Sequence, residues 1–385
     1  MAEIPRYRLE ALAAALSCYD YRLEIGRVAS LLGLSEQHTR LQLRRLRQLD
    51  EKLGYPSWAI TDARWLGLRL LIVILGGRET PARQLSVMFE PGHVPWWRRV
   101  HWLPFPNYLA MLGELYGGAY MMVYRVPPEL GVEIFDYFNS HEEKLGVKAI
   151  FGADYVPVRN CSGKVAYSAE DITRTYITHS KVFENEVRRG HVEPRLPARS
   201  RLLDVALYTA QESRPLARYA DLDKVEVVAL ARGYPPAKNL KLKTRLVQRH
   251  YQVLSGSGLL GRAWLGPLLH RDSEPALVTI TVPAECAEIL YTAVAATLAS
   301  PYIVLNNDMA FTVAYAPPSL QREISSFIAA QCCGEADTMV VTRYITSPMP
   351  VEMYDPEEQR WSRTPRNPLA ALRRYGLLQP IVVKN

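Results

Sequence analysis

The chain contains the same plan twice, about two hundred residues apart. The matching segments keep their order along the chain, at offsets of 200, 199 and 190 residues. A tandem duplication with loop insertions and deletions leaves this pattern, whereas chance matches would scatter in offset. Each copy is a basic helical segment followed by an α/β segment. This repetition predicts a function that uses two equivalent units. The matching pairs are Val28-Ala29 with Val228-Ala229, Gly33 with Gly233, Arg45-Leu46 with Arg245-Leu246, Trp65-Leu66-Gly67 with Trp264-Leu265-Gly266, and Pro127-Pro128 with Pro317-Pro318.

The composition is typical of a cytoplasmic globular protein with two to four domains in its 385 residues. The longest apolar run, residues 70–75, is far shorter than the roughly 20 residues of a membrane span, and the first ten residues show no secretory signal pattern. The cysteines form an odd set without a CxxC motif, so reduced thiols are expected. They are Cys18, Cys161, Cys286, Cys332 and Cys333.

The helical segment of the first copy predicts a helix-turn-helix unit. Residues 8–16, 22–32 and 36–53 have helical spacing of apolar side chains. Gly33 can end the second helix in the left-handed conformation, and Ser35 can cap the third. The third helix would present its first turn to base edges and its arginines to phosphates, although a helical hairpin that serves only as a protein interface stays open. The expected DNA contacts are Ser35, Gln37, His38, Arg40, Arg44, Arg45 and Arg47.

The second copy departs from this pattern. Gly233-Tyr234-Pro235-Pro236 replaces the Gly-Leu-Ser turn, so the polar cap is missing. The net charge of +7 and the pI near 9.1 permit a polyanionic partner, and much of the excess positive charge lies between 238 and 249. Cations without Gln or Asn suit phosphate contact better than base readout. The expected contacts of this degenerate unit are Lys238, Lys241, Lys243, Arg245 and Arg249.

The α/β segments each predict the order βαββαβ, a ferredoxin-like unit. In the second copy, strands are expected at 276–282, 302–305, 309–315 and 338–344, with helices at 284–298 and 320–330. In the first copy, strands are expected at 68–75, 108–116, 119–126 and 147–156. A further helix at 168–188 and a Pro/Arg linker at 191–200 connect the copies.

The run GLSEQHTRLQLRRLRQL, followed by a short wing and DARWLGL, resembles the Lrp/AsnC (feast/famine) family of regulators. This resemblance implies an α+β fold in which two winged helix-turn-helix domains alternate with two ferredoxin-like (ACT/RAM-like) domains. It also implies pairing of the two copies as an intrachain pseudo-dimer and a small-molecule effector. A further homodimer is expected because that pairing leaves the sheet edges and the Trp-rich segment 91–106 unsatisfied. The corresponding domains are 1–60, 61–160, 161–200 (connector), 201–262, 263–346 and 347–385 (tail).

The leading prediction is therefore a DNA-binding transcription regulator, associated with the nucleoid, that binds double-stranded DNA and is not an enzyme. No phosphate-binding glycine loop, GxSxG, HExxH or metal-ligand spacing occurs, so no cofactor and no metal are expected. Residues 91–106, which contain three tryptophans and two arginines, stay open as a partner surface, a nucleic-acid contact or a packed loop.

Two alternatives stay open beside the regulator. One is an architectural chromatin or partner-binding protein. The other is an enzyme, because siroheme decarboxylases resemble the same two-part architecture. Their pattern has a His-Asn-Tyr run before the third strand and a Tyr-Asn-x-Trp-Phe run within it. Here the corresponding stretches are Ser300-Pro301-Tyr302-Ile303 and Asp308-Met309-Ala310-Phe311-Thr312, which lack the histidine and the tryptophan.

Overall fold

A computed structural model describes most of the chain. The described residues are 4–54, 57–60, 63–76, 83–89, 100, 102–190, 201–213, 215–218, 244–256, 260–270, 276–332, 336–346, 350–355, 358, 360–364 and 381–382. Lys238, Lys241 and Lys243 lie outside these residues, as do Cys333, the linker 191–200 and most of the tryptophan-rich segment 91–106.

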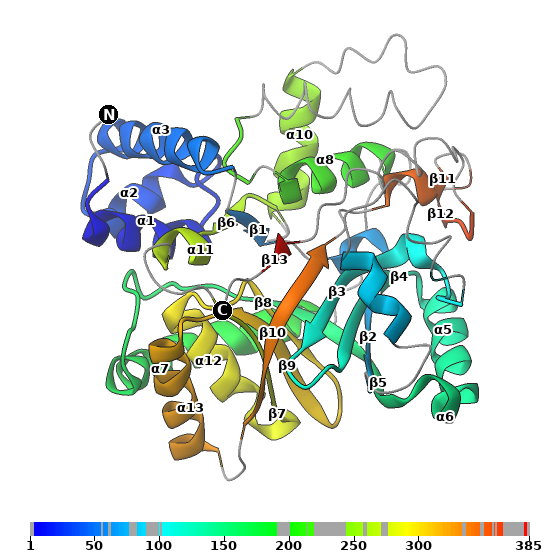
Figure 1. The fold of residues 1–385 in the computed structure, drawn as a ribbon. Coiled ribbons are helices and arrows are strands. Elements are labelled where there is room, and N and C mark those ends of the chain that lie inside the picture. Colours follow the sequence, from blue (N-terminus) through cyan, green and yellow to red (C-terminus); the bar gives the residue numbers. More distant parts are fainter. Residues whose placement is uncertain are drawn as a thin grey trace.

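Eight antiparallel strands close into one barrel (Figure 1). The order is β10-β3-β4-β2-β5-β8-β9-β7, and β7 pairs again with β10. A short strand, β13 (Ile381–Val382), pairs with the C-terminal half of β10, on the edge opposite β3. The barrel strands are β2 (Arg69–Leu75), β3 (Leu109–Leu115), β4 (Tyr120–Val126), β5 (Val147–Pro157), β7 (Leu277–Pro283), β8 (Tyr302–Leu305), β9 (Met309–Tyr315) and β10 (Asp337–Thr346).

This barrel makes the predicted fold class wrong. Winged helix-turn-helix domains do not alternate with separate ferredoxin-like domains, because strands of both copies share one closed sheet. The two junctions are the pairing of β5 with β8 and of β10 with β3. The physical reason is that an edge strand exposes unpaired backbone N–H and C=O groups, and closure removes every such edge.

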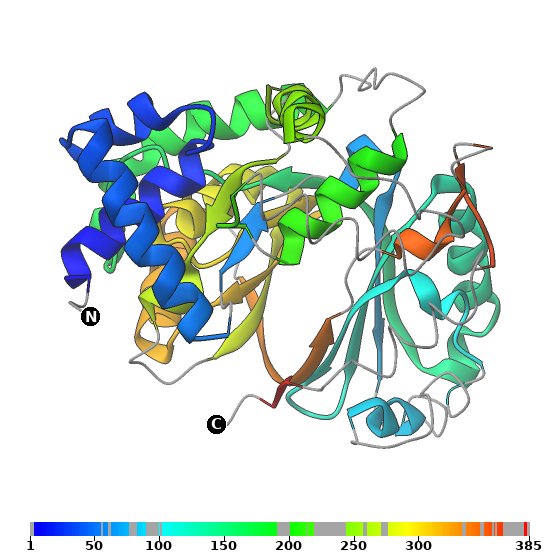
Figure 2. The ribbon, with the colours of Figure 1, turned by 90° about the horizontal axis from the view of Figure 1, so that it is seen from above.

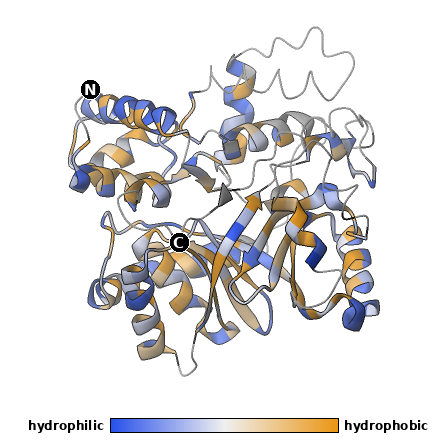
Figure 3. Ribbon diagram, in the orientation of Figure 1, coloured by the Kyte–Doolittle hydropathy of each residue, from blue (hydrophilic) through white to orange (hydrophobic). Residues whose placement is uncertain are grey.

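Helices cover the outside of the barrel. Beside the strands of the first copy lie α5 (Pro128–Ser140) and α6 (Glu142–Leu145). Beside those of the second copy lie α7 (Ala169–Gly190), α12 (Ala287–Thr297) and α13 (Pro318–Gln331). Strands such as β2 and β4 are therefore buried on both faces, which explains their continuous apolar runs. Hydrophobic colour follows these strands in Figure 3.

The inside of the barrel has its own apolar cluster. Leu70 and Ile72 of β2 point inward with Val123 of β4, while Leu71 and Val73 belong to the cluster under the outer helices. This alternation follows from the period of two in a strand.

A helical layer lies over one end of the barrel (Figures 1 and 2). The first copy supplies α1 (Arg6–Cys18), α2 (Ile25–Leu32) and α3 (Glu36–Lys52). The second copy supplies α8 (Arg201–Ser213), α10 (Thr244–Gly256) and α11 (Gly266–Leu269). The remaining described elements are short. They are the 3-10 helices η1 (Ala63–Leu66), η2 (Gln84–Phe89), η4 (Pro106–Tyr108), η6 (Ala284–Cys286) and η7 (Val351–Met353), and a small hairpin of β11 (Tyr354–Asp355) with β12 (Arg360–Trp361).

The predicted wing is not a wing. The strand after α3, β1 (Trp58–Ile60), pairs antiparallel with its counterpart in the second copy, β6 (Arg262–Trp264). Trp58 lies opposite Trp264, with the ring centroids 5.3 Å apart in an edge-to-face arrangement. Each strand satisfies the backbone groups of the other, so neither is left to reach outward.

Two disulfides join distant parts of the chain, which makes the prediction of reduced thiols wrong for four of the cysteines. Cys18, the last residue of α1, is bonded to Cys161, beyond the end of β5, with a Cα–Cα distance of 5.0 Å. Cys286 is bonded to Cys332 with a Cα–Cα distance of 5.9 Å. Separations of 143 and 46 residues leave no local spacing signal, so only the folded chain reveals the partners.

Among the described residues, no helix has both the length and the apolar character needed to cross a bilayer.

Because two histidines are buried, we expect the free energy of unfolding to fall in mild acid. His179 on α7 and His270 after α11 are almost fully buried, and burial lowers the pKa of each to about 4. The unfolded chain takes up these protons near pH 6.5, so stability falls as the pH drops from about 6.5 to about 4. Asp20 acts in the opposite direction, because burial raises its pKa to about 6. Folded Asp20 therefore takes up its proton at a higher pH than unfolded Asp20, and this difference stabilises the fold as the pH drops over the same window.

Urea unfolding of wild type and His179→Leu at pH 7.5 and pH 5 measures this effect. The wild type should lose about 2 kcal/mol more than the variant between the two pH values. Equal losses in both proteins would contradict a neutral buried His179.

Candidate ligand-binding site

A pocket of about 300 Å³ lies between the end of the barrel and the helical layer. Both copies contribute to it, because its walls come from strands of each half and from β1 and α8. Most of the lining is apolar, as in typical small-molecule sites. The lining residues are Trp58, Ala59, Leu70, Ala110, Met111, Val123, Arg125, Tyr155, Glu212, Pro301, Tyr302, Val313 and Thr346.

Arg125 is the cation of this pocket. It lies on β4, opposite Leu70 of β2 and on the same face as Val123, so its side chain enters the barrel end. Its guanidinium pairs with the carboxylate of Glu212 from α8. Burial alone would lower the pKa of Arg125, but the charge of Glu212, with Tyr208 and Tyr155, raises it above its ordinary value. The arginine therefore stays charged inside an apolar wall.

Two tyrosines form a flat wall next to this ion pair. Tyr155 of β5 and Tyr302 of β8 are diagonal neighbours on paired strands, and their rings stack with centroids 4.8 Å apart and planes at 28°. Burial raises the pKa of Tyr302, so its hydroxyl remains a proton-bearing donor at neutral pH. Among the described lining residues only Arg125 and Glu212 carry charge. The arrangement suits a planar, apolar ligand that bears a carboxylate.

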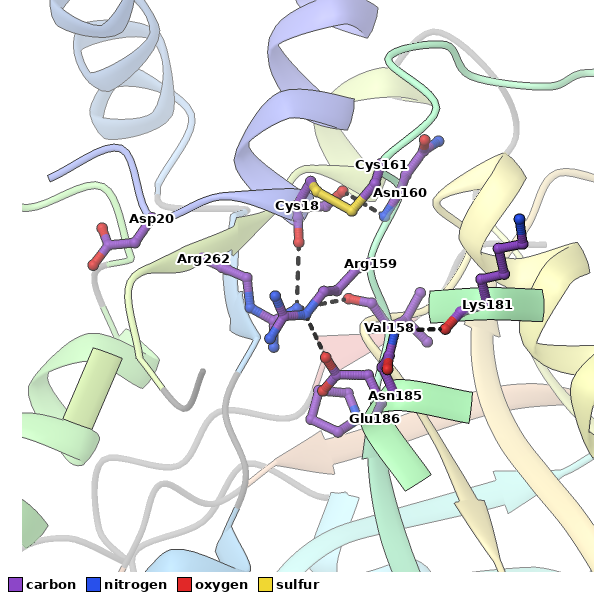
Figure 4. A network of polar contacts seen from close by, with 12 residues as sticks. Cys18, Asp20, Val158, Arg159, Asn160, Cys161, Lys181, Asn185, Glu186 and Arg262 are labelled. Carbon is purple, nitrogen blue, oxygen red and sulfur yellow. Dashed lines mark hydrogen bonds and ion pairs between the residues drawn. A yellow bond between two sulfur atoms is a disulfide. The ribbon is translucent and has the colours of Figure 1, made fainter. Parts of the chain in front are cut away.

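A buried polar network connects the floor of the pocket to the helical layer (Figure 4). The backbone N–H of Val158, next to the end of β5, donates to the carbonyl of Pro301 in the pocket wall at 2.9 Å. Arg159 and Glu186 form an ion pair at 2.7 Å, and the guanidinium of Arg262 lies beside that of Arg159. Burial, and then the charge of Arg159, lower the pKa of Arg262 to about 9. The pocket floor is thus tied to β6 and α7.

A second pocket of about 460 Å³ lies outside the barrel, against α5. It shares Leu70 with the first pocket, and its polar groups include Arg69 of β2 and Asp154 of β5. Its described lining residues include no stacked pair of rings and no ion pair. It therefore has fewer groups that could bind or act on a ligand than the pocket at the barrel end.

The first turn of α3 forms as the sequence predicts. Ser35 is the N-cap, and its hydroxyl accepts a hydrogen bond from the backbone N–H of His38 at 3.3 Å. Gly33 ends α2 in the left-handed conformation, with φ of 62°. Gln37 and Arg40 are exposed, and Arg40 pairs with Glu36.

The other predicted DNA contacts that the structure describes lie on two helices, and none of these described residues lines the pocket. Arg44 and Arg45 are exposed on α3, and Arg245 and Arg249 are exposed on α10. Arg47 is half-buried, and its Nε donates to the carbonyl of Leu216 at 2.8 Å. The helix that was expected to face DNA therefore uses one arginine to hold the segment after α8.

No family model and no curated protein matches the chain. Two solved structures of the siroheme decarboxylase NirDL are similar to it, each with 12% sequence identity over 88% of this chain. The structure in co-complex with an iron-uroporphyrin III analogue has a TM-score of 0.44 and is covered over 92% of its length. The other has a TM-score of 0.43 and is covered over 91%. At this similarity we transfer no residue role from those structures.

The identification as an Lrp/AsnC-type transcription regulator is wrong. No family model or curated protein supports it, and the similar solved structures are those of an enzyme that binds a tetrapyrrole analogue. The predictions of double-stranded DNA as partner and of no enzymatic activity are wrong for the same reason, and nucleoid association has no support. The physical reason for the error is that basic helices after a glycine turn form in either class of protein.

Sequence reasoning missed the two charged residues of the pocket, Arg125 and Glu212. Arg125 left one signal, because it is a charged residue within the apolar run 120–126 and on the face of Val123. Glu212 left none, because it meets Arg125 from 87 residues away through packing of α8 over the barrel.

Proposed function

We propose that this protein is a siroheme decarboxylase-like enzyme that binds a carboxylate-bearing tetrapyrrole at the barrel-end pocket. The observation that carries the proposal is the convergence of Arg125 with the stacked Tyr155 and Tyr302 in an otherwise apolar pocket. A tetrapyrrole of this class is a flat ring system with carboxylate side chains. The flat ring system matches the stacked tyrosines, and the carboxylates match Arg125.

Arg125 would hold a substrate carboxylate through paired N–H donors, the geometry in which arginine binds carboxylates most strongly. The pocket volume of about 300 Å³ is at the lower end of ligand sites, so we expect it to receive one edge of the macrocycle. The apolar walls exclude water from that edge, which strengthens the electrostatic contacts inside.

The polar groups of this pocket differ from the pattern described for siroheme decarboxylases. Ser300-Pro301-Tyr302 replaces the His-Asn-Tyr run, and it places Tyr302 in the pocket wall. The hydroxyl of Ser300 accepts a hydrogen bond from Thr312 at 2.8 Å, so Ser300 supports the start of β8. We propose that Tyr302 and Arg125 supply the substrate contacts of this chain.

A visible-absorption titration with iron-uroporphyrin III tests binding. Arg125→Gln should weaken the affinity by about 10- to 100-fold, because a charge-assisted pair is lost. The control is Arg44→Gln, an exposed arginine on α3, which should bind like wild type. Because Arg125→Gln leaves Glu212 without its cation, the double variant Arg125→Gln with Glu212→Gln keeps the pocket neutral and should bind as weakly. Wild-type affinity in both variants would refute the site.

Turnover is tested by incubating the protein with siroheme and following loss of carbon dioxide by mass spectrometry. Binding without any loss would contradict the enzyme and leave a tetrapyrrole-binding protein.

A further inference from the structure

The Arg125–Glu212 pair is balanced in charge before any ligand arrives. Both side chains are largely withdrawn from water, with 22% of Arg125 and 20% of Glu212 exposed. A substrate carboxylate at Arg125 would place two carboxylates against one guanidinium in a low-dielectric pocket. With a single guanidinium between them, each carboxylate raises the proton affinity of the other. A proton that entered with the ligand would restore the charge balance.

Glu212 cannot easily move away from Arg125. The segment that follows α8 is held by the first copy, because Arg22 donates to the carbonyls of Pro215 at 2.6 Å and Ala217 at 2.8 Å. Tyr21 donates to the carbonyl of Leu216 at 2.8 Å. These bonds fix the C-terminal end of α8, so we expect the extra charge to be relieved by protonation of Glu212 and not by withdrawal of its helix.

Resting on the proposed function, we propose that Glu212 takes up one proton when the substrate carboxylate binds Arg125 and delivers it to carbon in the decarboxylation step. In that step the bond between the side-chain methylene and the carboxylate breaks. Its electron pair remains on the methylene carbon, which receives the proton of Glu212. The products are a methyl group, carbon dioxide and the Glu212 carboxylate, which pairs with Arg125 again.

The surrounding groups favour Glu212 as this donor. Among the residues that the structure describes, the ionisable side chains that act on the pair are Tyr155 of β5, Tyr302 of β8 and Tyr208 on α8 itself. A phenol with a raised pKa, as Tyr302 has, is a poorer acid than a carboxylic acid. On the elements packed against α8, His250 of α10 is paired with Asp204 at 3.1 Å, Glu352 lies buried on η7 and Arg64 lies on η1. The partial exposure of Glu212 leaves a route for its proton to be replaced from solvent.

Calorimetric titration with iron-uroporphyrin III, repeated at pH 7 in buffers of different ionisation enthalpy, measures proton uptake on binding. Wild type should take up about one more proton per ligand than Glu212→Gln, which should bind at least as tightly. The matched control is Glu133→Gln on α5, which removes a half-exposed glutamate that is also paired with an arginine, Arg363, and should behave like wild type. Equal proton uptake in wild type and Glu212→Gln would overturn the proposal.

Single-turnover decarboxylation of siroheme is the second measurement. Glu212→Gln should slow the step by about a hundredfold or more, and Glu212→Asp should recover part of the rate. The rate of Glu212→Gln should also lose the pH dependence that wild type shows. If wild type binds no tetrapyrrole, the proposed function fails. If wild type turns over and Glu212→Gln matches it, only the role of Glu212 fails.

Discussion

Replacing Cys18 with serine is expected to lower the free energy of unfolding by roughly 5 kcal/mol, the largest effect that the structure predicts for one side chain. The Cys18–Cys161 disulfide closes a loop of 143 residues, and a loop of that length restricts the unfolded chain by roughly 5 kcal/mol in the chain-entropy model. It also joins the end of α1 in the helical layer to the segment that follows β5 of the barrel. Denaturant unfolding under non-reducing conditions measures the loss.

The matched variants make this prediction specific. Cys161→Ser and the double variant should lose the same amount as Cys18→Ser, because all three remove one cross-link. A reductant added to the double variant should remove about 4 kcal/mol more, since the loop closed by Cys286–Cys332 spans 46 residues. Unfolding of the wild type that does not respond to reductant would contradict both disulfides.

Replacing Trp264 with alanine should cost about 4 kcal/mol. Trp264 is 2% exposed and packs edge-to-face against Trp58, where the small strands of the two copies pair. Its indole N–H donates to the carbonyl of Leu298 at 2.6 Å. The alanine variant would lose the buried ring and leave that carbonyl without its donor.

Trp264→Phe separates the two contributions, because it keeps an aromatic ring and removes only the N–H. It should cost about 1–2 kcal/mol by the same denaturant measurement. A loss below about 1 kcal/mol in Trp264→Ala would show that β1 and β6 do not hold the two copies together.

The proposed site was much less predictable than the elements that build it. The strand 119–126 was expected from its apolar residues, and Arg125 stood out within it only as an exception. Its importance depends on Glu212, Tyr155 and Tyr302, which come from another helix and two other strands. No spacing along the chain encodes those contacts, because they form only when the barrel closes and α8 packs over its end.

The local elements were determined by the sequence itself. Ser35 caps α3 and Gly33 ends α2 because a short polar side chain and a residue without Cβ satisfy those backbone positions wherever the chain goes. The strands at 302–305 and 309–315 followed from their apolar residues and the Asn306-Asn307-Asp308 turn between them.

The tertiary structure alone decided what those elements do. The strand expected as a wing pairs with its counterpart, four of the cysteines form disulfides, and the sheets of both copies close into one barrel. Each outcome depends on strand edges or side chains that are at least 46 residues apart in the sequence and meet only in the folded chain. Local patterns determine which groups need partners, and only the complete fold determines which partners they find.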